Sequence, residues 1–270
     1  MLAHLRVPWA FVVRDFREDS SYKIGFLFRV ATAVINVAIY YFIASAFGSA
    51  AAPYLSIYSG NYFAFVIIGV AFSEYLAIGI GAIGESIRQG QTTGTLELML
   101  LSPTRLVVTL LSSSLWSYVF ATLRVVVYLI VGVALGMRID QANVLFALLS
   151  LVVAIVSFNA LGLFSASVII LMKRGDTLGW ALRVSSLVLS GVYYPVEVLP
   201  GWLRALGQLL PLTHALELLR RSLLLGEGFG QLWSELLILA GLTIVLLPLG
   251  VLACHLAIQV ARTDGSLSHY

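Results

Sequence analysis

The chain has 270 residues, of which 60% are hydrophobic and only 11% are charged, and its mean hydropathy is +0.98. Soluble domains carry about a quarter charged residues, so this composition excludes an ordinary soluble protein and indicates an integral membrane protein. The formal net charge of +3 is small and its basic residues form no cluster, which argues against a nucleic-acid partner. The single cysteine, Cys254, supports neither a disulfide framework nor a metal site.

The N-terminal segment, residues 1–23, is predicted to be an amphipathic helix that lies in the membrane interface. Its apolar face is formed by residues at helical spacing: Leu5, Trp9, Val12 and Phe16. The alternative is an ordinary soluble amphipathic helix. Because acidic residues interrupt the first twenty positions and no small-residue cleavage site follows an apolar core, we expect this segment to be retained rather than removed as a signal peptide.

Residues 24–258 are predicted to form an all-α, six-span transmembrane domain, because a span needs about 20 mostly apolar residues. The predicted spans are 24–47, 62–84, 106–136, 144–172, 178–194 and 232–258. The second span holds glycines that favour close helix packing. Residues 48–61 are predicted to be an outer loop, Pro195 to end the fifth span, and Pro248 to kink the sixth. Residues 259–270 form the predicted tail.

The distribution of basic residues predicts that both termini of this multi-pass protein are cytoplasmic. The segments that this topology places inside contain Arg6, Arg14, Arg17, Lys23, Arg88, Arg105, Lys173, Arg174 and Arg262. The outer turns contain only Arg138, and the region after Pro195 adds three more arginines. Inner loops are enriched in Lys and Arg, so the excess favours this orientation in the cell (inner) membrane.

A short apolar segment separates the second and third spans, at residues 89–105 (QGQTTGTLELMLLSPTR). Thr95 is predicted to cap a helix whose first turn carries Glu97, and Pro103 ends it. The resulting helix, about residues 94–102, is too short to span a membrane and too apolar to face water. Its position predicts a protein partner that covers it on the cytoplasmic side.

The region 195–230 is divided by prolines into apolar pieces that are too short to span the membrane. Pieces of about ten to fourteen apolar residues are more often re-entrant or interfacial than spanning. Irregular backbone at membrane depth is tolerated where protein buries it or a cavity wets it. We therefore predict a helical hairpin that dips into the membrane from the outer face.

Ionisable residues inside predicted spans are candidates for function. Glu74 and Arg124 lie on neighbouring spans, so we expect them to pair with each other in preference to contacting substrate. For Arg183 the two roles, structural pairing and substrate contact, are equally expected. Arg29, near a span end, is expected to have a structural role, either in an ion pair or by reaching toward the headgroups. Tyrosines near span ends either line a conduit or anchor the interface. The translocation-path candidates are Glu74, Arg124, Arg183, Tyr194 and Pro195.

The sequence contains no G-x-x-x-x-G-K-[ST] loop, so the chain is not expected to bind or hydrolyse ATP itself. Its four histidines are scattered, which gives no nucleophile–base arrangement, and His214 lacks the neighbouring ligands of a metal site. We therefore expect no enzyme activity and no cofactor in this chain. An active transporter of this kind would take its energy from another chain.

At two places the chain resembles the permease subunits of type 2 ATP-binding-cassette exporters. Gly94-Thr95-Leu96-Glu97, followed by Leu100, Leu101 and Pro103, resembles their cytoplasmic coupling helix. Ser190-Gly191, Tyr194-Pro195, Leu199-Pro200 and Trp202, followed by Leu210-Pro211-Leu212-Thr213 and Arg220, is similar to their fifth span and outer hairpin. The resemblance assigns contact with the ATPase to Gly94, Thr95, Leu96, Glu97, Leu98, Leu100, Leu101 and Pro103.

The resemblance implies a homodimer, or a dimer with a sister permease, in membrane lipid. Two cytosolic ATP-binding subunits would hold ATP and Mg, and a drug, lipid or lipid-linked glycan would leave through the dimer centre. The alternative function is an ion-gradient-driven secondary transporter, which favours midplane carboxylates and broken helices in both halves. Only Glu74 is such a carboxylate and the broken region occurs once, so we favour the exporter. An intramembrane enzyme is disfavoured by the lack of a catalytic cluster.

Overall fold

The computed structural model describes residues 3–21, 23–58, 60–92, 106–172 and 176–263, and every regular element in these ranges is a helix. This confirms the all-α class. The first helix, α1 (Ala3–Ser21), corresponds to the predicted N-terminal helix. Trp9 is 69% exposed on it, and its place in the membrane interface stays a prediction.

The predicted outer loop at residues 48–61 is wrong, because most of it is helical. Helix α2 (Lys23–Ala51) continues into it and is followed by the 3-10 segment η1 (Ala52–Tyr58). Alanines favour the helix, and Pro53 is tolerated in the first turn of η1. Leu55 and Tyr58 are buried against α3 and hold η1 in place.

Helix α3 (Tyr62–Thr92) begins as predicted and extends about two turns beyond the predicted end of the second span. The third predicted span is two helices, α5 (Leu106–Ser113) and α6 (Leu115–Ala134), with a break at Ser114. The Ser114 hydroxyl donates to the Leu111 carbonyl at 2.9 Å, and such local bonds compete with the helical ladder. The run of three serines explains why the helix breaks here.

Helix α7 (Val144–Met172) has the bounds predicted for the fourth span. The following helix, α8 (Thr177–Leu189), ends five residues earlier than the predicted fifth span. Its 13 residues extend about 20 Å, which is less than the ~30 Å hydrocarbon thickness. Gly191 adopts a φ of 73° in the turn after α8, a conformation that favours glycine.

The predicted division of residues 195–230 into short pieces is confirmed. The pieces are η2 (Val196–Val198), α9 (Gly201–Gln208) and α10 (Pro211–Leu224). A proline precedes η2 and α9, and Pro211 is the first residue of α10, where its missing N–H costs no helical hydrogen bond. We call α9 and α10 the hairpin.

The last helix, α11 (Phe229–Thr263), runs through Pro248 and extends into the predicted tail. Within the described residues, five helical segments are long and apolar enough to cross a membrane: Lys23–Tyr58, Tyr62–Gly90, Leu111–Ala134, Val144–Met172 and Phe229–Val260. The chain is therefore a multi-pass membrane protein. Helix α8 is shorter than these, so the sixth span stays a prediction.

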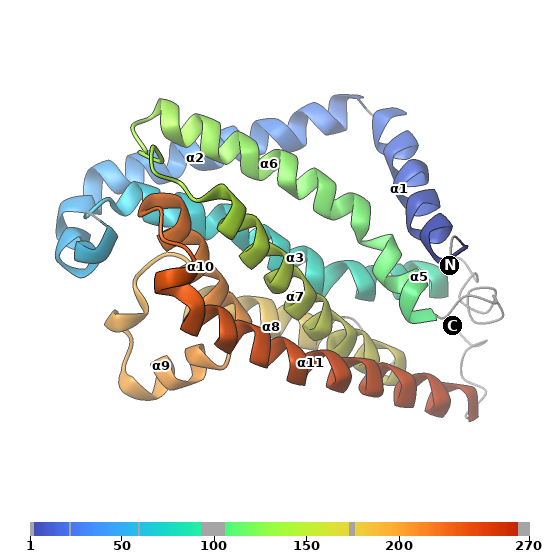
Figure 1. The fold of residues 1–270 in the computed structure, drawn as a ribbon. Helices are drawn as coiled ribbons and strands as arrows, with labels where there is room; N and C mark the ends of the chain where they lie inside the picture. The colour runs from blue at the N-terminus through green and yellow to red at the C-terminus, as the bar shows by residue number, and fades with distance from the viewer. Residues whose placement is uncertain (1–2, 22, 59, 93–105, 173–175, 264–270) are drawn as a thin grey trace.

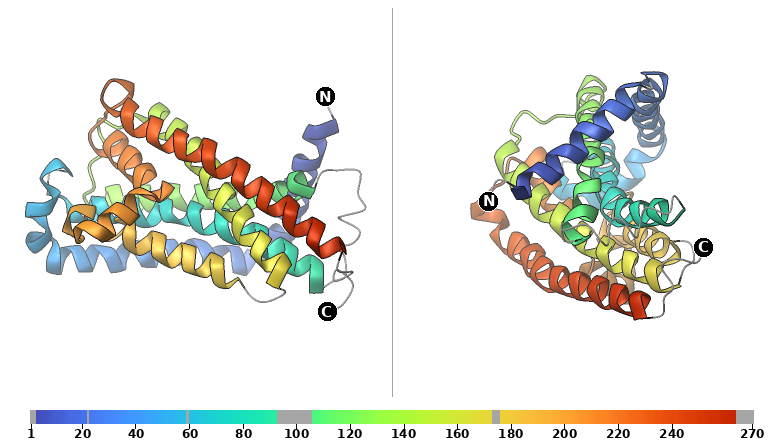
Figure 2. Two further views of the ribbon diagram at one scale, coloured as in Figure 1. Left: turned by 90° about the horizontal axis from the view of Figure 1, so that it is seen from below. Right: turned by 90° about the vertical axis from the view of Figure 1, so that its right-hand side faces the viewer.

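The long helices lie side by side in a bundle whose two ends differ (Figures 1 and 2). Helix α1, helix α5 and the last turns of α11 lie at one end, which we call the α1 end. Segment η1 and the hairpin lie at the other end, the hairpin end. Each end of the bundle carries one group of polar side chains around a cavity.

Helix α7 occupies the core and packs against both α3 and α11. Its closest approach to α3 is at glycines: a Cβ atom on Gly162 would collide with the backbone oxygen of Gly79. On the other side, Gly250 of α11 lies against the Ala160 carbonyl in the same way. Small residues therefore let these membrane helices pack backbone to backbone.

Candidate functional site

A cleft of about 720 Å³ lies toward the α1 end, between α1, α2, α3, α6 and α8. It is lined by four acidic and four basic side chains, and we call it the charged cleft. These residues are Asp19, Arg29, Glu74, Glu85, Arg88, Arg124, Asp176 and Arg183. Trp116, Phe120 and Trp180 add aromatic walls.

The Glu74 carboxylate on α3 contacts the Arg124 guanidinium on α6, so the predicted pair is formed. The two side chains are 14% and 28% exposed, and the pair is therefore largely removed from solvent. Within the described residues the buried Arg124 Nε has no hydrogen-bond partner. The pair joins two spans, and both side chains line the cleft.

Arg183 on α8 lies 3.1 Å from the Asp176 carboxylate at the start of the same helix. Asp176 also caps α8 by accepting from the Gly179 N–H at 2.9 Å, and it accepts from the Ser165 hydroxyl on α7 at 2.7 Å. The sequence analysis missed Asp176. Its place directly before a helix, where an acidic side chain satisfies free N–H groups, was a usable signal.

Asp19 joins α1 to the bundle. Its carboxylate accepts hydrogen bonds from Arg29 of α2 at 3.1 and 3.2 Å and from the indole N–H of Trp116 of α6 at 2.6 Å. The structure pairs Arg29 with Asp19, which is one of the two structural roles expected for Arg29, because α1 brings a carboxylate within reach. Sequence reasoning also missed Asp19, which the pattern of α1 does not distinguish from its neighbours.

Arg220 is the most buried charged side chain at the hairpin end, with 3% exposure. Its guanidinium donates to the Phe65 carbonyl of α3 and to the Val192 carbonyl after α8, both at 3.1 Å. Burial lowers the pKa of Arg220 to about 10, so the group remains charged at neutral pH. Gly69 makes room for this arrangement, since a Cβ there would collide with both Arg220 and Val192.

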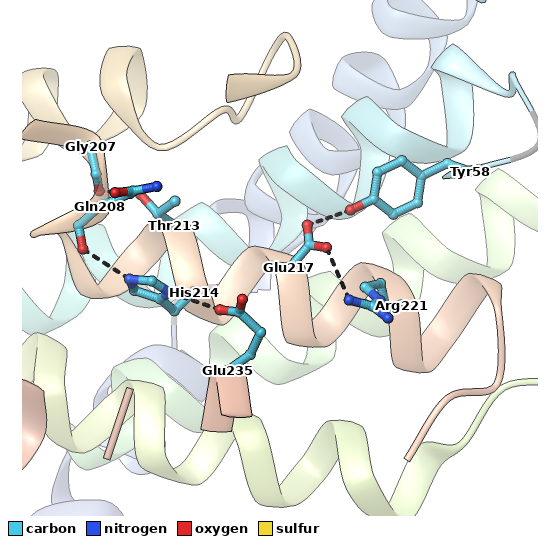
Figure 3. A network of polar contacts seen from close by, with 8 residues as sticks. All are labelled: Tyr58, Gly207, Gln208, Thr213, His214, Glu217, Arg221 and Glu235. Atoms are coloured by element: carbon cyan, nitrogen blue, oxygen red, sulfur yellow. Dashed lines mark hydrogen bonds and ion pairs between the residues drawn. The ribbon is translucent and has the colours of Figure 1, made fainter. Parts of the chain in front are cut away.

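A second set of polar contacts involves Glu217 and Arg221 of α10 (Figure 3). The Tyr58 hydroxyl donates to Glu217 at 2.5 Å, and Arg221 lies 3.7 Å from Glu217 and 2.6 Å from Glu227. These contacts tie η1, α10 and the turn before α11 together. A cavity of about 440 Å³ adjoins them.

His214 links three helices at this end (Figure 3). Its Nδ1 lies 2.9 Å from the Glu235 carboxylate of α11, and its Nε2 lies 2.9 Å from the Gln208 carbonyl of α9. Both ring nitrogens thus face oxygen atoms, and the ring connects α10 to α9 and to α11. No group of three or more potential metal ligands occurs among the residues that the structure describes.

The structure divides the translocation-path candidates into two groups. Glu74, Arg124 and Arg183 share the charged cleft, whereas Pro195 lines the cavity at the hairpin end. Tyr194 donates to the Val188 carbonyl at 2.5 Å and so closes the turn after α8. Whether any of the five contacts substrate stays a prediction.

The residues predicted to contact an ATPase, from Gly94 to Pro103, lie outside the described residues. The helices that flank them in sequence, α3 and α5, have their adjoining ends at the α1 end of the bundle (Figure 1). Helix α1 packs directly on α5 and α6. The α1 end is therefore where a partner acting on this segment would reach described helices.

Comparison with known proteins identifies the family. A family model described as the ABC-2 type transporter matches residues 91–224, which extend from the segment after α3 through the hairpin. No curated protein matches the chain. The match includes both motifs that carried the resemblance, and the structure around them is a multi-pass helical bundle. The chain therefore belongs to the ABC-2 type transporter family, as a membrane permease subunit.

Proposed function

We propose that this permease is the membrane half of an ATP-driven exporter for a hydrophobic or amphipathic substrate such as a drug, a lipid or a lipid-linked glycan. A separate cytosolic ABC subunit, which the family implies, binds ATP and Mg and supplies the energy. Two permeases, either two copies or this chain with a sister, form the path in the inner membrane. Both termini lie on the cytoplasmic side.

The observation that carries this proposal is the family match across the apolar segment 94–102. The segment is too short to span a membrane and too apolar for water, which favours a covering protein. Its flanking helices and α1 share one end of the bundle (Figure 1). A motor that docks there acts on α3 and α5, and α1 packs against α5.

The charge pattern supports an ATP-driven transporter over a secondary one. Glu74 was the one predicted mid-span carboxylate that could bind a coupling ion. This carboxylate is already engaged in an ion pair with Arg124. Secondary transporters also favour broken helices in corresponding positions of both halves. In the described part of this chain the breaks lie at Ser114, within the third predicted span, and in the hairpin, after the fifth, so they do not fall at the same span of each half.

The test is to substitute the predicted docking segment in the intact complex. We expect Leu98→Asp and Glu97→Arg to abolish ATP-dependent transport and to release the ATPase during purification, while the permease remains in the membrane. The matched control is Leu209→Asp, the same change at an exposed leucine of the hairpin end. Unchanged transport and co-purification in the Leu98 variant would overturn the docking mechanism.

A further inference from the structure

The charged cleft is electrically balanced. Its four arginines each have an acidic neighbour within 4 Å: Arg29 with Asp19, Arg88 with Glu85, Arg124 with Glu74, and Arg183 with Asp176. The last two pairs are the deepest, with side chains 12% to 28% exposed. The cleft therefore presents separated charges of both signs but no net charge.

This balance selects among ligand headgroups. An anion that binds Arg183 adds a second negative charge beside Asp176 in a partly buried site, with no cation to balance it, which is costly. A cation that binds Asp176 likewise adds an unbalanced positive charge beside Arg183. A zwitterionic group brings one charge for each partner and keeps the balance, so it gains complementary contacts without stranding a charge.

The surroundings of the cleft suit an amphiphile with such a headgroup. Trp116 and Trp180 line the cleft, and tryptophan faces attract ammonium groups. A mostly apolar pocket of about 260 Å³ adjoins the cleft, shares Asp19 and Trp116 with it, and is further lined by Phe16, Phe26 and Lys23. A hydrocarbon chain fits beside a headgroup that lies in the charged part.

We propose that the charged cleft binds the headgroup of a zwitterionic amphiphile, and that such molecules are the class of substrate that the permease moves. The anionic part of the headgroup contacts Arg124 and Arg183. The cationic part contacts the facing carboxylates and the tryptophan rings. The substrate assignment rests on the proposed exporter function, whereas the binding preference does not.

The first measurement is lipid retention by the purified permease in native mass spectrometry. Three lipids with identical acyl chains are compared: a zwitterionic phosphocholine, an anionic phosphoglycerol and a cationic trimethylammonium-propane. We expect the phosphocholine lipid to bind roughly tenfold more tightly than either of the others, since each of those adds an unbalanced charge. Equal retention, or preference for a singly charged lipid, would overturn the proposal.

Charge variants make the test directional. Asp176→Asn keeps a side chain that can cap α8 but leaves the cleft with one excess positive charge, so preference should shift to the anionic lipid. Arg183→Gln should shift it to the cationic lipid. Glu227→Gln removes one negative charge, as Asp176→Asn does, but at the hairpin end. It should therefore leave the order of lipid affinities unchanged. If the folded variants bound the three lipids in the wild-type order of affinity, the charged cleft would not be the binding site. The wild-type order of affinity is measured independently of these variants.

A final pair of measurements separates headgroup from cargo. Soluble glycerophosphocholine at matched concentration should fail to displace the lipid; equal competition would remove the role of the apolar pocket. In nanodiscs with the ATPase subunit, the phosphocholine lipid should raise ATP hydrolysis, and Asp176→Asn should abolish this response. Selective binding without stimulation would identify a resident bilayer lipid and overturn the substrate assignment. A complex that transports nothing with ATP would overturn the exporter function but leave the binding result intact.

Discussion

The Arg220 guanidinium of α10 stacks over the Phe65 ring of α3, 3.4 Å from its centroid, and donates a hydrogen bond to the backbone carbonyl of the same residue. A second bond to Val192 fixes the turn that follows α8. One buried cation thus joins three segments that are far apart in the sequence. The position of the hairpin depends on the planar guanidinium, because two different nitrogens, Nε and Nη2, donate to the two carbonyls.

We predict that Arg220→Lys lowers the free energy of unfolding by about 2 kcal/mol, because a lysine ammonium cannot make both bonds and stack on the ring. Denaturation of the purified protein in detergent micelles measures this loss. The control is Arg138→Lys, in the exposed turn before α7, which should change stability by less than about 0.5 kcal/mol. Equal effects at the two arginines would show that Arg220 does not hold the hairpin.

The pair of Glu74 and Arg124 predicts a non-additive response. Glu74→Gln strands the Arg124 charge and should cost about 1–2 kcal/mol, less than a fully buried pair because Arg124 is partly exposed. The double variant with Arg124→Gln should recover part of this loss, since neither charge is then unpaired. A double-variant cycle on unfolding free energies tests it; additive losses would mean that the two residues act independently.

The sequence predicted most of the helices because their signals are local. The bounds of α7 follow from one largely apolar run without charged residues, and its start is marked by Asn143, whose side chain accepts from the Phe146 N–H at 3.1 Å. The prolines predicted the short pieces of the hairpin equally well. Apolar content was sufficient to identify the membrane class.

The errors arose where distant contacts determine the structure. Residues 190–194 continue the apolar pattern of α8, yet the helix ends because Gly191 turns the chain and Arg220 binds the Val192 carbonyl from 28 residues away. Segment η1 was predicted as a loop because its burial depends on α3. In the charged cleft, the pairing of Glu74 with Arg124 was predictable from their spans, and Asp176 could have been identified as a helix cap, whereas Asp19 acquires its role only when α1 packs.

Because α3 and α7 cross at glycines, the effect of a Gly→Ala substitution on stability should depend strongly on its position. Gly162→Ala places a methyl group against the Gly79 backbone and should destabilise the protein by about 1–3 kcal/mol through overpacking. Gly241→Ala, in α11, meets open space and should raise stability by about 0.5–1 kcal/mol through helix propensity. Thermal unfolding in detergent distinguishes the two signs. A stabilising effect at Gly162 would contradict the backbone-to-backbone packing.

The contact between Asp19 and Trp116 predicts how α1 is held. Asp19→Ala removes the acceptor for the Trp116 indole and for Arg29, and bonds to a charged group are worth about 1.5–3 kcal/mol each. After discounting for the partial exposure of Arg29, we expect α1 amides to exchange hydrogen at least about tenfold faster, with α7 unaffected. Asp15→Ala is the matched control, because Asp15 on the same helix pairs with its neighbour Arg14 at 2.7 Å. If both variants left α1 equally protected, helix packing on α5 rather than the Asp19 contacts would hold α1 to the bundle.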